Sequence, residues 1–159
     1  MAEKLAVAKW EGKASAKVLG VSADQIWSLL RDFAAIHKWI PNLDSSDIIE
    51  GESEKIGCVR FNAGPPLPGS QDPSYAKEKL IGMDPGHRSF TYQVLDNNIG
   101  FDYYVGTITV SPDGDDACTI HWSYEAEPMQ GWTNEQILEY VALEVETMAK
   151  RMGEALKAE

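Results

Sequence analysis

The stretch that decides the fold is TNEQILEYVALEVETMAKRMGEA, residues 133–155. Thr133 is followed three positions later by Gln136, and this capping box marks the start of a helix. Apolar side chains then recur at helical spacing, at Ile137, Val141, Val145, Met148, Met152 and Ala155. Charged residues lie opposite them, at Glu139, Glu146 and Lys150. We therefore predict a long amphipathic helix with an apolar stripe that needs a sheet to pack against.

Seven segments upstream of this helix have the composition and alternation of β-strands. The first, residues 9–20, places its small and apolar side chains on one face and its charged ones on the other. The others are residues 45–52, 57–63, 75–83, 89–95, 101–111 and 117–128. Short turn-like segments separate most consecutive strands, which predicts an antiparallel meander.

Two short helices are expected between the first and second strands. Ser22 and Gln25 form a capping box for a helix from Ser22 to about Arg31, and residues 33–39 predict another helical turn. A sheet with one solvated face must cover its other face, and the C-terminal helix supplies that cover. We predict one α+β domain over residues 1–159, a helix-grip fold in which a curved seven-stranded antiparallel sheet surrounds the long helix.

Composition and charge restrict the partners of this chain. Its 159 residues carry a formal net charge of -11, which disfavours nucleic acid and anionic membranes as partners. We expect no membrane insertion, since no apolar run is long enough to span a bilayer, and MAEKLAVAKW lacks the apolar core of a signal peptide. Two isolated cysteines predict reduced thiols and a cytoplasmic location, and the scattered histidines predict no metal site. We expect a monomer.

Glu78 stands out in the strand YAKEKLIG, residues 75–82. Side chains alternate between the two faces of a strand, so Glu78 leaves its lysine neighbours and joins Ala76 and Leu80 on the apolar face. An inward carboxylate either extends to water at the edge of the sheet or is placed inside a pocket. The neighbouring strands help to distinguish these alternatives.

Other polar side chains share the inward face on the following strands. Tyr92 lies with Phe90 and Val94, Tyr104 shares its parity with Asp102, and Trp122 is inward on the last strand. Inward residues of consecutive strands converge, and apolar walls with a few polar groups are typical of a small-molecule cavity. An inward tyrosine or tryptophan is also common in an ordinary core.

Arg60 is ambiguous from parity alone. Its neighbours Val59 and Phe61 are apolar, so alternation places Arg60 on the outer face as a solvated cation. If Arg60 instead points inward, it lies on the strand next to Glu78 and keeps that carboxylate ionised inside the cavity.

Several blocks of the sequence resemble the plant lachrymatory factor synthase family. They are WEGK (10–13), DFAAIHKWIP (32–41), GCVRF (57–61), AKEKL (76–80) and WSYEAEP (122–128). That family belongs to the superfamily of polyketide cyclase/dehydrase, START-like and Bet v 1-like proteins. The resemblance implies a helix-grip fold with an internal cavity. It also implies a cofactor-free isomerisation of an alkenyl sulfenic acid to a thial S-oxide.

The same resemblance implies the roles of individual residues. The arginine of the GCVR block and the glutamate of the AKEKL block correspond to Arg60 and Glu78, which places Arg60 inside. We predict Arg60, Glu78 and Tyr104 as catalytic residues. The predicted substrate-binding residues are Tyr92, Trp122, Phe90, Asp102, Leu80, Val145 and Met148.

Two departures from that family concern the cavity. The loop of residues 64–74 is slightly longer and different in sequence, and it lies at the expected cavity mouth. A glutamate near Glu144 stands where the family's onion enzyme carries a tryptophan. The fold and the polar pair therefore transfer better than the substrate does.

Other functions share this fold. The main alternative is a non-catalytic carrier or receptor for a small lipid, polyketide or hormone-like metabolite, which needs the cavity but not the chemistry of Glu78. Fern hydroxynitrile lyases carry a similar GCVR block, but their acid aligns nearer Ala76. Abscisic acid receptors have a Pro-containing gate loop like GPPLPG, but their His-Arg-Leu latch has no counterpart near residues 97–104.

Overall fold

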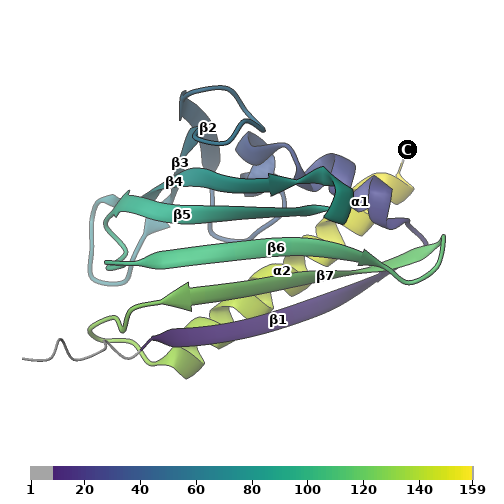
Figure 1. Cartoon of the computed structure of the whole chain (residues 1–159). Helices are drawn as coiled ribbons and strands as arrows, with labels where there is room; N and C mark the ends of the chain where they lie inside the picture. Colours follow the sequence, from purple (N-terminus) through teal and green to yellow (C-terminus); the bar gives the residue numbers. More distant parts are fainter. Residues whose placement is uncertain (1–8, 159) are drawn as a thin grey trace, which may run out of the picture.

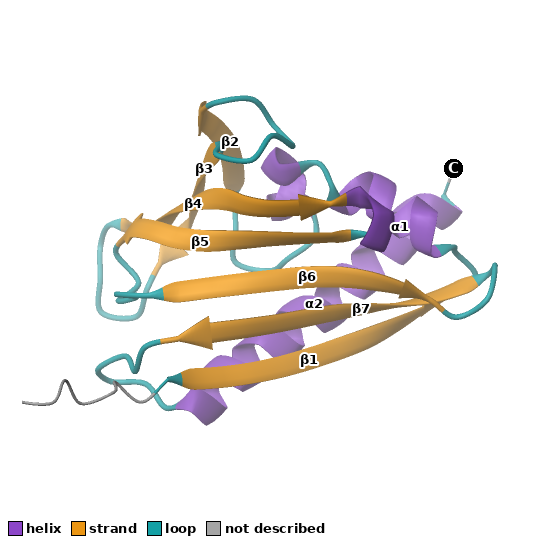
Figure 2. Ribbon diagram, viewed as in Figure 1, coloured by secondary structure: helices purple, strands orange, loops and turns teal. Residues whose placement is uncertain are grey.

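The structure of the protein, a computed structural model, describes residues 9–158. A curved sheet lies along one side of a long helix, α2 (Asn134–Lys157), as Figures 1 and 2 show. The sheet is seven-stranded and antiparallel, in the order β1-β7-β6-β5-β4-β3-β2. Its strands are β1 (Trp10–Leu19), β2 (Ser45–Glu50), β3 (Val59–Pro66), β4 (Pro73–Asp84), β5 (Ser89–Asn97), β6 (Tyr104–Pro112) and β7 (Ala117–Ala126). The predicted helix-grip fold is confirmed.

The two short helices also form where the sequence predicts them. Helix α1 (Ala23–Leu30) and the 3₁₀ helix η1 (Phe33–Lys38) connect β1 to β2, and η2 (Pro85–His87) is one further 3₁₀ turn. Ser22 caps α1, and Thr133 caps α2. In each case the capping side chain accepts from the N3 backbone N–H while the N3 glutamine closes the box.

The apolar stripe of α2 packs against the concave face of the sheet. Six of its hydrophobic residues are buried: Ile137, Val141, Val145, Met148, Ala149 and Met152. They belong to one core cluster with inward residues of the sheet such as Val18, Leu80, Ile108 and Ile120, and the helix lies closest to β1 and β7. Within residues 9–158, none of the helices is long and apolar enough to cross a membrane.

Strand boundaries differ from prediction at two places that affect the site. The strand expected over 101–111 begins at Tyr104, because residues 102 and 103 form a bend after the 96–100 turn. The Asn97 side chain organises that turn, since its Oδ1 accepts from the backbone N–H groups of Ile99, Gly100 and Phe101. Side-chain parity therefore does not extend from Tyr104 back to Asp102.

The segment of residues 41–44, between η1 and β2, is held tightly against β3. Asp44 N donates to Ala63 O at 2.8 Å. The carbonyl oxygen of Asn42 lies only 2.1 Å from where a Cβ on Gly64 would be. Asn42 itself has φ 64°, in the left-handed region. A side chain at position 64 is therefore incompatible with this approach, and glycine allows it.

Candidate functional site

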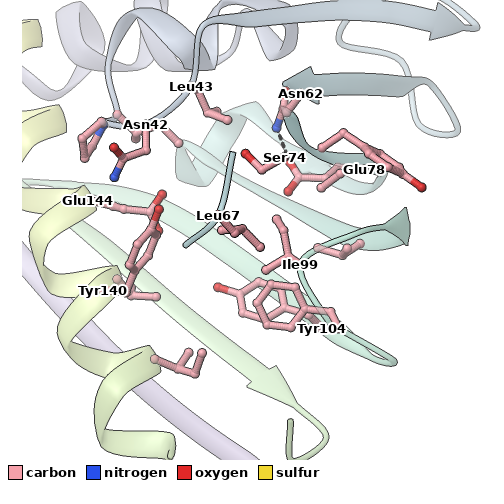
Figure 3. Close-up of a pocket in the computed structure, with 18 of the residues that line it drawn as sticks. Asn42, Leu43, Asn62, Leu67, Ser74, Glu78, Ile99, Tyr104, Tyr140 and Glu144 are labelled. Carbon is pink, nitrogen blue, oxygen red and sulfur yellow. Dashed lines mark hydrogen bonds between the residues drawn. The ribbon is translucent and has the colours of Figure 1, made fainter. Parts of the chain in front are cut away.

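A cavity of about 460 Å³ lies between the sheet and α2. Its walls come from strands β3 to β7, from α2 and η1, and from connecting segments that include residues 41–43 and 67–68 (Figure 3). Its polar or charged lining side chains include Arg60, Asn62, Ser74, Glu78, Tyr92, Tyr104, Tyr140 and Glu144. Most other lining residues are apolar. A volume of this size with sparse polar groups suits a small, largely apolar molecule.

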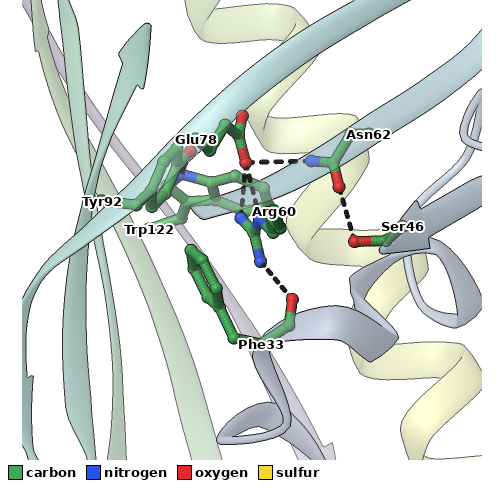
Figure 4. Close-up of polar contacts among 7 residues, drawn as sticks. All are labelled: Phe33, Ser46, Arg60, Asn62, Glu78, Tyr92 and Trp122. Atoms are coloured by element: carbon green, nitrogen blue, oxygen red, sulfur yellow. Dashed lines mark hydrogen bonds and ion pairs between the residues drawn. The ribbon is translucent and has the colours of Figure 1, made fainter. Parts of the chain in front are cut away.

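Arg60 and Glu78 meet at the cavity wall. They are register partners on β3 and β4, and both point to the concave side (Figure 4). Arg60 Nη2 lies 2.6 Å from Glu78 Oε1, and Arg60 Nε donates to the same oxygen at 2.8 Å. The side chains are 3% and 12% exposed, so the ion pair is largely removed from water. The inward position implied for Arg60 is thus found, and the outward alternative from parity is wrong.

Parity misleads at Arg60 because the outer face of the sheet carries an aromatic pair. Phe61 on β3 stacks on Tyr75 of β4, with ring centroids 5.5 Å apart and an interplanar angle of 10°. This cross-strand contact gives an apolar residue a stabilising position on the outer surface. Phe61 therefore faces outward, and its neighbours Arg60 and Asn62 face inward.

Additional contacts fix the pair. Arg60 Nη1 donates to Phe33 O at 2.9 Å, and its guanidinium carbon lies 3.8 Å from the centre of the Phe33 ring. Asn62 Nδ2 donates to Glu78 Oε1 at 2.9 Å, while Ser46 Oγ donates to Asn62 Oδ1 at 2.6 Å. Among the described residues, every hydrogen bond to the Glu78 carboxylate reaches Oε1. Within residues 9–158, no protein group donates a hydrogen bond to Glu78 Oε2.

The two predicted tyrosines lie beside this network. Tyr92 and Tyr104 line the cavity with ring centroids 6.1 Å apart. Tyr92 Oη accepts a hydrogen bond from Trp122 Nε1 at 3.2 Å, so the tyrosine keeps its own proton available. Burial raises the pKa of Tyr92 well above its usual value, and burial likewise raises the pKa of Tyr104. Both are therefore neutral hydrogen-bond donors near neutral pH.

Five of the predicted substrate-binding residues do not line the cavity. Asp102 is exposed in the bend before β6, because the strand starts later than predicted. Leu80, Phe90, Val145 and Met148 are fully buried in the core around the cavity but outside its lining. Their apolar periodicity identified core positions correctly, but it does not distinguish a packed core from a cavity wall.

Glu144 is a second carboxyl group in the cavity wall. It comes from α2 and lies across the cavity from Glu78 (Figure 3). Its side chain is half-buried and lines the cavity. Burial and, less strongly, the charge of Glu78 raise the pKa of Glu144 to about 8, although Arg60 acts in the opposite direction. Glu144 therefore holds a proton near neutral pH.

Sequence reasoning missed some members of the site. Asn62 shares the parity of Arg60, so an inward Arg60 already implied an inward Asn62. The Phe33 carbonyl could not be foreseen, because it depends on where η1 packs against the sheet. The alignment marks Glu144 only as a departure from the resembled family and not as a site residue. Its spacing gave a further signal, because it lies three residues after Val141 and four before Met148, at the edge of the apolar stripe.

Comparison with known proteins adds to this geometry. The family model for "Polyketide cyclase / dehydrase and lipid transport" matches residues 11–158. The chain is 30% identical over 116 residues to S-norcoclaurine synthase from Thalictrum flavum subsp. glaucum, covering 67% of this chain. The match spans about half, 52%, of that relative's length.

Solved structures show the same fold. Norcoclaurine synthase from Thalictrum flavum, in complex with dopamine and hydroxybenzaldehyde, has a TM-score of 0.69 at 23% identity, covering 96% of this chain and 88% of that one. Ginseng major latex-like protein 151 from Panax ginseng has a TM-score of 0.67 at 18% identity, covering 92% and 97%. XoxI from Bacillus cereus has a TM-score of 0.73 at 22% identity, covering 91% and 94%. Since the family model covers nearly the whole chain, this protein belongs to the polyketide cyclase/dehydrase and lipid transport family.

Proposed function

We propose that this protein is a cofactor-free isomerase or lyase that moves a proton within a small metabolite bound in the cavity. The arrangement of the Glu78 carboxylate is the observation that carries this proposal. Arg60 and Asn62 hold Oε1 with three contacts of 2.6, 2.8 and 2.9 Å, while Oε2 has no partner among the described residues. A carboxylate fixed by one oxygen and open at the other is suited to act as a general base.

The surrounding residues have complementary roles in this proposal. Arg60 holds the Glu78 carboxylate in place and supplies positive charge as an anion develops on the substrate. Tyr104 and Tyr92 donate hydrogen bonds to a substrate oxygen, and the Trp122 contact orients the Tyr92 hydroxyl for this. Trp122 lines the cavity beside the Tyr92 ring and is a substrate-binding residue in this proposal.

The lining residues restrict the reaction type. Arg60 is the basic side chain among them, and no lysine is present in the described lining. An amine nucleophile that forms a Schiff base with a carbonyl substrate is therefore not supplied by this cavity. Proton transfer by carboxyl and hydroxyl groups remains as the chemistry that the lining favours. The resemblance to lachrymatory factor synthases suggests a substrate of the alkenyl sulfenic acid type.

Purified protein given sulfenic acid generated in place from an alkenyl cysteine sulfoxide tests this function. We expect formation of the thial S-oxide, and we expect Glu78→Gln to reduce its rate by about 10²- to 10⁴-fold. Glu50→Gln, an exposed carboxylate on β2, is the control and should match the parent protein. No product from the parent protein would remove the sulfenic acid as substrate. Equal rates for parent and Glu78→Gln would remove Glu78 as the base.

A carrier or receptor is the second candidate. The mostly apolar lining and the volume of about 460 Å³ favour it, because binding requires only these features. Thermal shift against a panel of small apolar metabolites distinguishes the two functions. Tight binding that survives Glu78→Gln, without turnover of the ligand, would favour the carrier. Binding followed by a Glu78-dependent change in the ligand would favour the enzyme.

A further inference from the structure

Glu144 lies on the inner side of α2, although its carboxyl group makes no hydrogen bond or ion pair with the other described residues. The stripe formed by Ile137, Val141, Val145, Met148 and Met152 packs on the sheet, and Glu144 lies at its edge, directly before Val145. A carboxyl group among apolar neighbours costs stability unless a partner compensates for the lost water. An apolar residue at this position would widen the stripe toward the cavity, so the glutamate needs another explanation.

No basic side chain among residues 9–158 forms an ion pair with Glu144. None of the ion pairs or side-chain hydrogen bonds of the described residues involves its carboxyl group. Arg60, the basic residue of the cavity, is already engaged by Glu78 and by the Phe33 carbonyl. Glu144 thus remains protonated, as its raised pKa of about 8 also indicates.

The cavity therefore contains two carboxyl groups in different surroundings. Glu78, on the sheet wall, is an acceptor of three donor contacts and has one open oxygen. Glu144, on the helix wall, faces the same enclosed space (Figure 3). Two titratable groups whose surroundings separate their protonation states are the arrangement used for paired acid and base catalysis.

We propose that Glu144 is the proton donor of this cavity and acts opposite Glu78, on a substrate that presents an acidic C–H or O–H group to Glu78 and a proton-accepting atom to Glu144. This inference rests on the proposed function and deepens it. Glu78 Oε2 takes the proton, and the bonding pair left behind moves through the substrate toward its other end. The accepting atom there takes the proton of Glu144. The substrate is isomerised without gain or loss of atoms, and solvent exchange restores the two carboxyl groups.

Phenylacetone is a suitable probe, because its size and apolar ring fit the cavity and its α-protons report both steps. In D₂O, Glu78 removes a benzylic proton while Glu144 protonates the carbonyl oxygen, which yields the enol. Reversal of these steps places deuterium on carbon. We expect NMR to show exchange that is lost in Glu78→Gln and reduced at least ~10-fold in Glu144→Gln. Glu146→Gln, on the exposed face of α2, is the matched control and should behave like the parent.

The pH dependence supplies a readout that a structural role of Glu144 would not move. The titratable or charged groups that face it in the cavity are Arg60 on β3, Glu78 on β4, Tyr92 on β5, Tyr104 on β6 and Tyr140 on α2 itself. The pKa values of the three tyrosines are raised from their usual value, so they stay protonated when Glu144 ionises. Exchange by the parent should fall above about pH 8 as Glu144 loses its proton. Glu144→Gln should lack this fall.

The outcomes separate this inference from the proposed function. Exchange that needs Glu78 but is unchanged in Glu144→Gln overturns the donor role alone. Equal losses in Glu144→Gln and Glu146→Gln also overturn it, because they would show a general effect on the helix. No Glu78-dependent exchange by the parent removes the proposed function, and the donor role is removed with it. Circular dichroism of each variant confirms that the compared proteins are folded.

Discussion

Arg60 contacts one and the same oxygen of Glu78 twice, from Nη2 at 2.6 Å and from Nε at 2.8 Å. Arginine often binds a carboxylate through both of its oxygens, and here the second oxygen is left for another partner. The Asn62 amide adds a third contact to Oε1 and reinforces this asymmetry. The pair therefore fixes the carboxylate without occupying the oxygen that lies free at the cavity wall.

Removal of Arg60 should destabilise the protein strongly. Arg60→Met leaves Glu78 in a nearly buried site with only Asn62 as its partner, and loss of one member of a buried ion pair costs about 3–5 kcal/mol. Urea unfolding measures this loss. Arg31→Met, which breaks the exposed pair with Glu54, is the control and should change the free energy of unfolding by at most ~1 kcal/mol.

The double variant Arg60→Met/Glu78→Met distinguishes a charge effect from a packing effect. Without Glu78 there is no uncompensated buried charge, so we expect the double variant to regain much of the stability lost in Arg60→Met. A double variant no more stable than the single one would show that Arg60 contributes by its packing on the Phe33 ring instead.

The hydrogen bond from Trp122 to Tyr92 should contribute to stability. Tyr92→Phe removes the acceptor of the buried Trp122 N–H, and an unsatisfied buried donor costs about 1–3 kcal/mol. Unfolding of Tyr92→Phe, Trp122→Phe and the double variant forms a double-mutant cycle. A coupling energy near zero would contradict a role for this hydrogen bond, whatever the cost of each single change.

Much of the architecture could be predicted because it depends on local patterns. The capping boxes at Ser22 and Thr133, the stripe of α2 and the alternation of β1 all act over a few residues. The inward side of Glu78 followed from parity, since Lys77 and Lys79 on either side needed water. The inward side of its partner Arg60 did not follow from parity, because the stack of Phe61 on Tyr75 places an apolar residue on the outer face.

Interactions between distant segments explain the remaining differences. Asp102 was misplaced because the Asn97 side chain, five residues earlier, ends the regular alternation before β6. Phe90 is a core residue because the rings of Trp27 on α1 and Phe33 on η1 pack against it. The distance between a helix and the sheet that it covers cannot be predicted from a local sequence pattern. The extent of the cavity is therefore a property of the packed structure.

Gly64→Ala should distort the 41–43 segment of the cavity wall. The new Cβ would lie 2.1 Å from Asn42 O, so the backbone of the 41–43 segment must move. We expect a loss of about 1–3 kcal/mol in unfolding free energy, as for other overpacked sites. Gly86→Ala is the control, because its Cβ would make only an ordinary contact with Asp84 at 3.5 Å. Equal stability of the two variants would contradict the tight approach.

The protonation of Glu144 should appear as a pH dependence of stability. The carboxyl group has a pKa of about 8 when folded and about 4.3 when unfolded, so the folded protein binds the extra proton between these values. Its contribution is fully present at low pH and is lost as the pH rises through this window. Relative to Glu144→Gln, the parent should lose roughly 1–4 kcal/mol between about pH 5 and pH 8. Urea unfolding across this range measures the difference, with Glu146→Gln as the control that should follow the parent. Parallel curves for the parent and Glu144→Gln would show that Glu144 is ionised in the folded protein, and that the cavity holds two charged carboxylates.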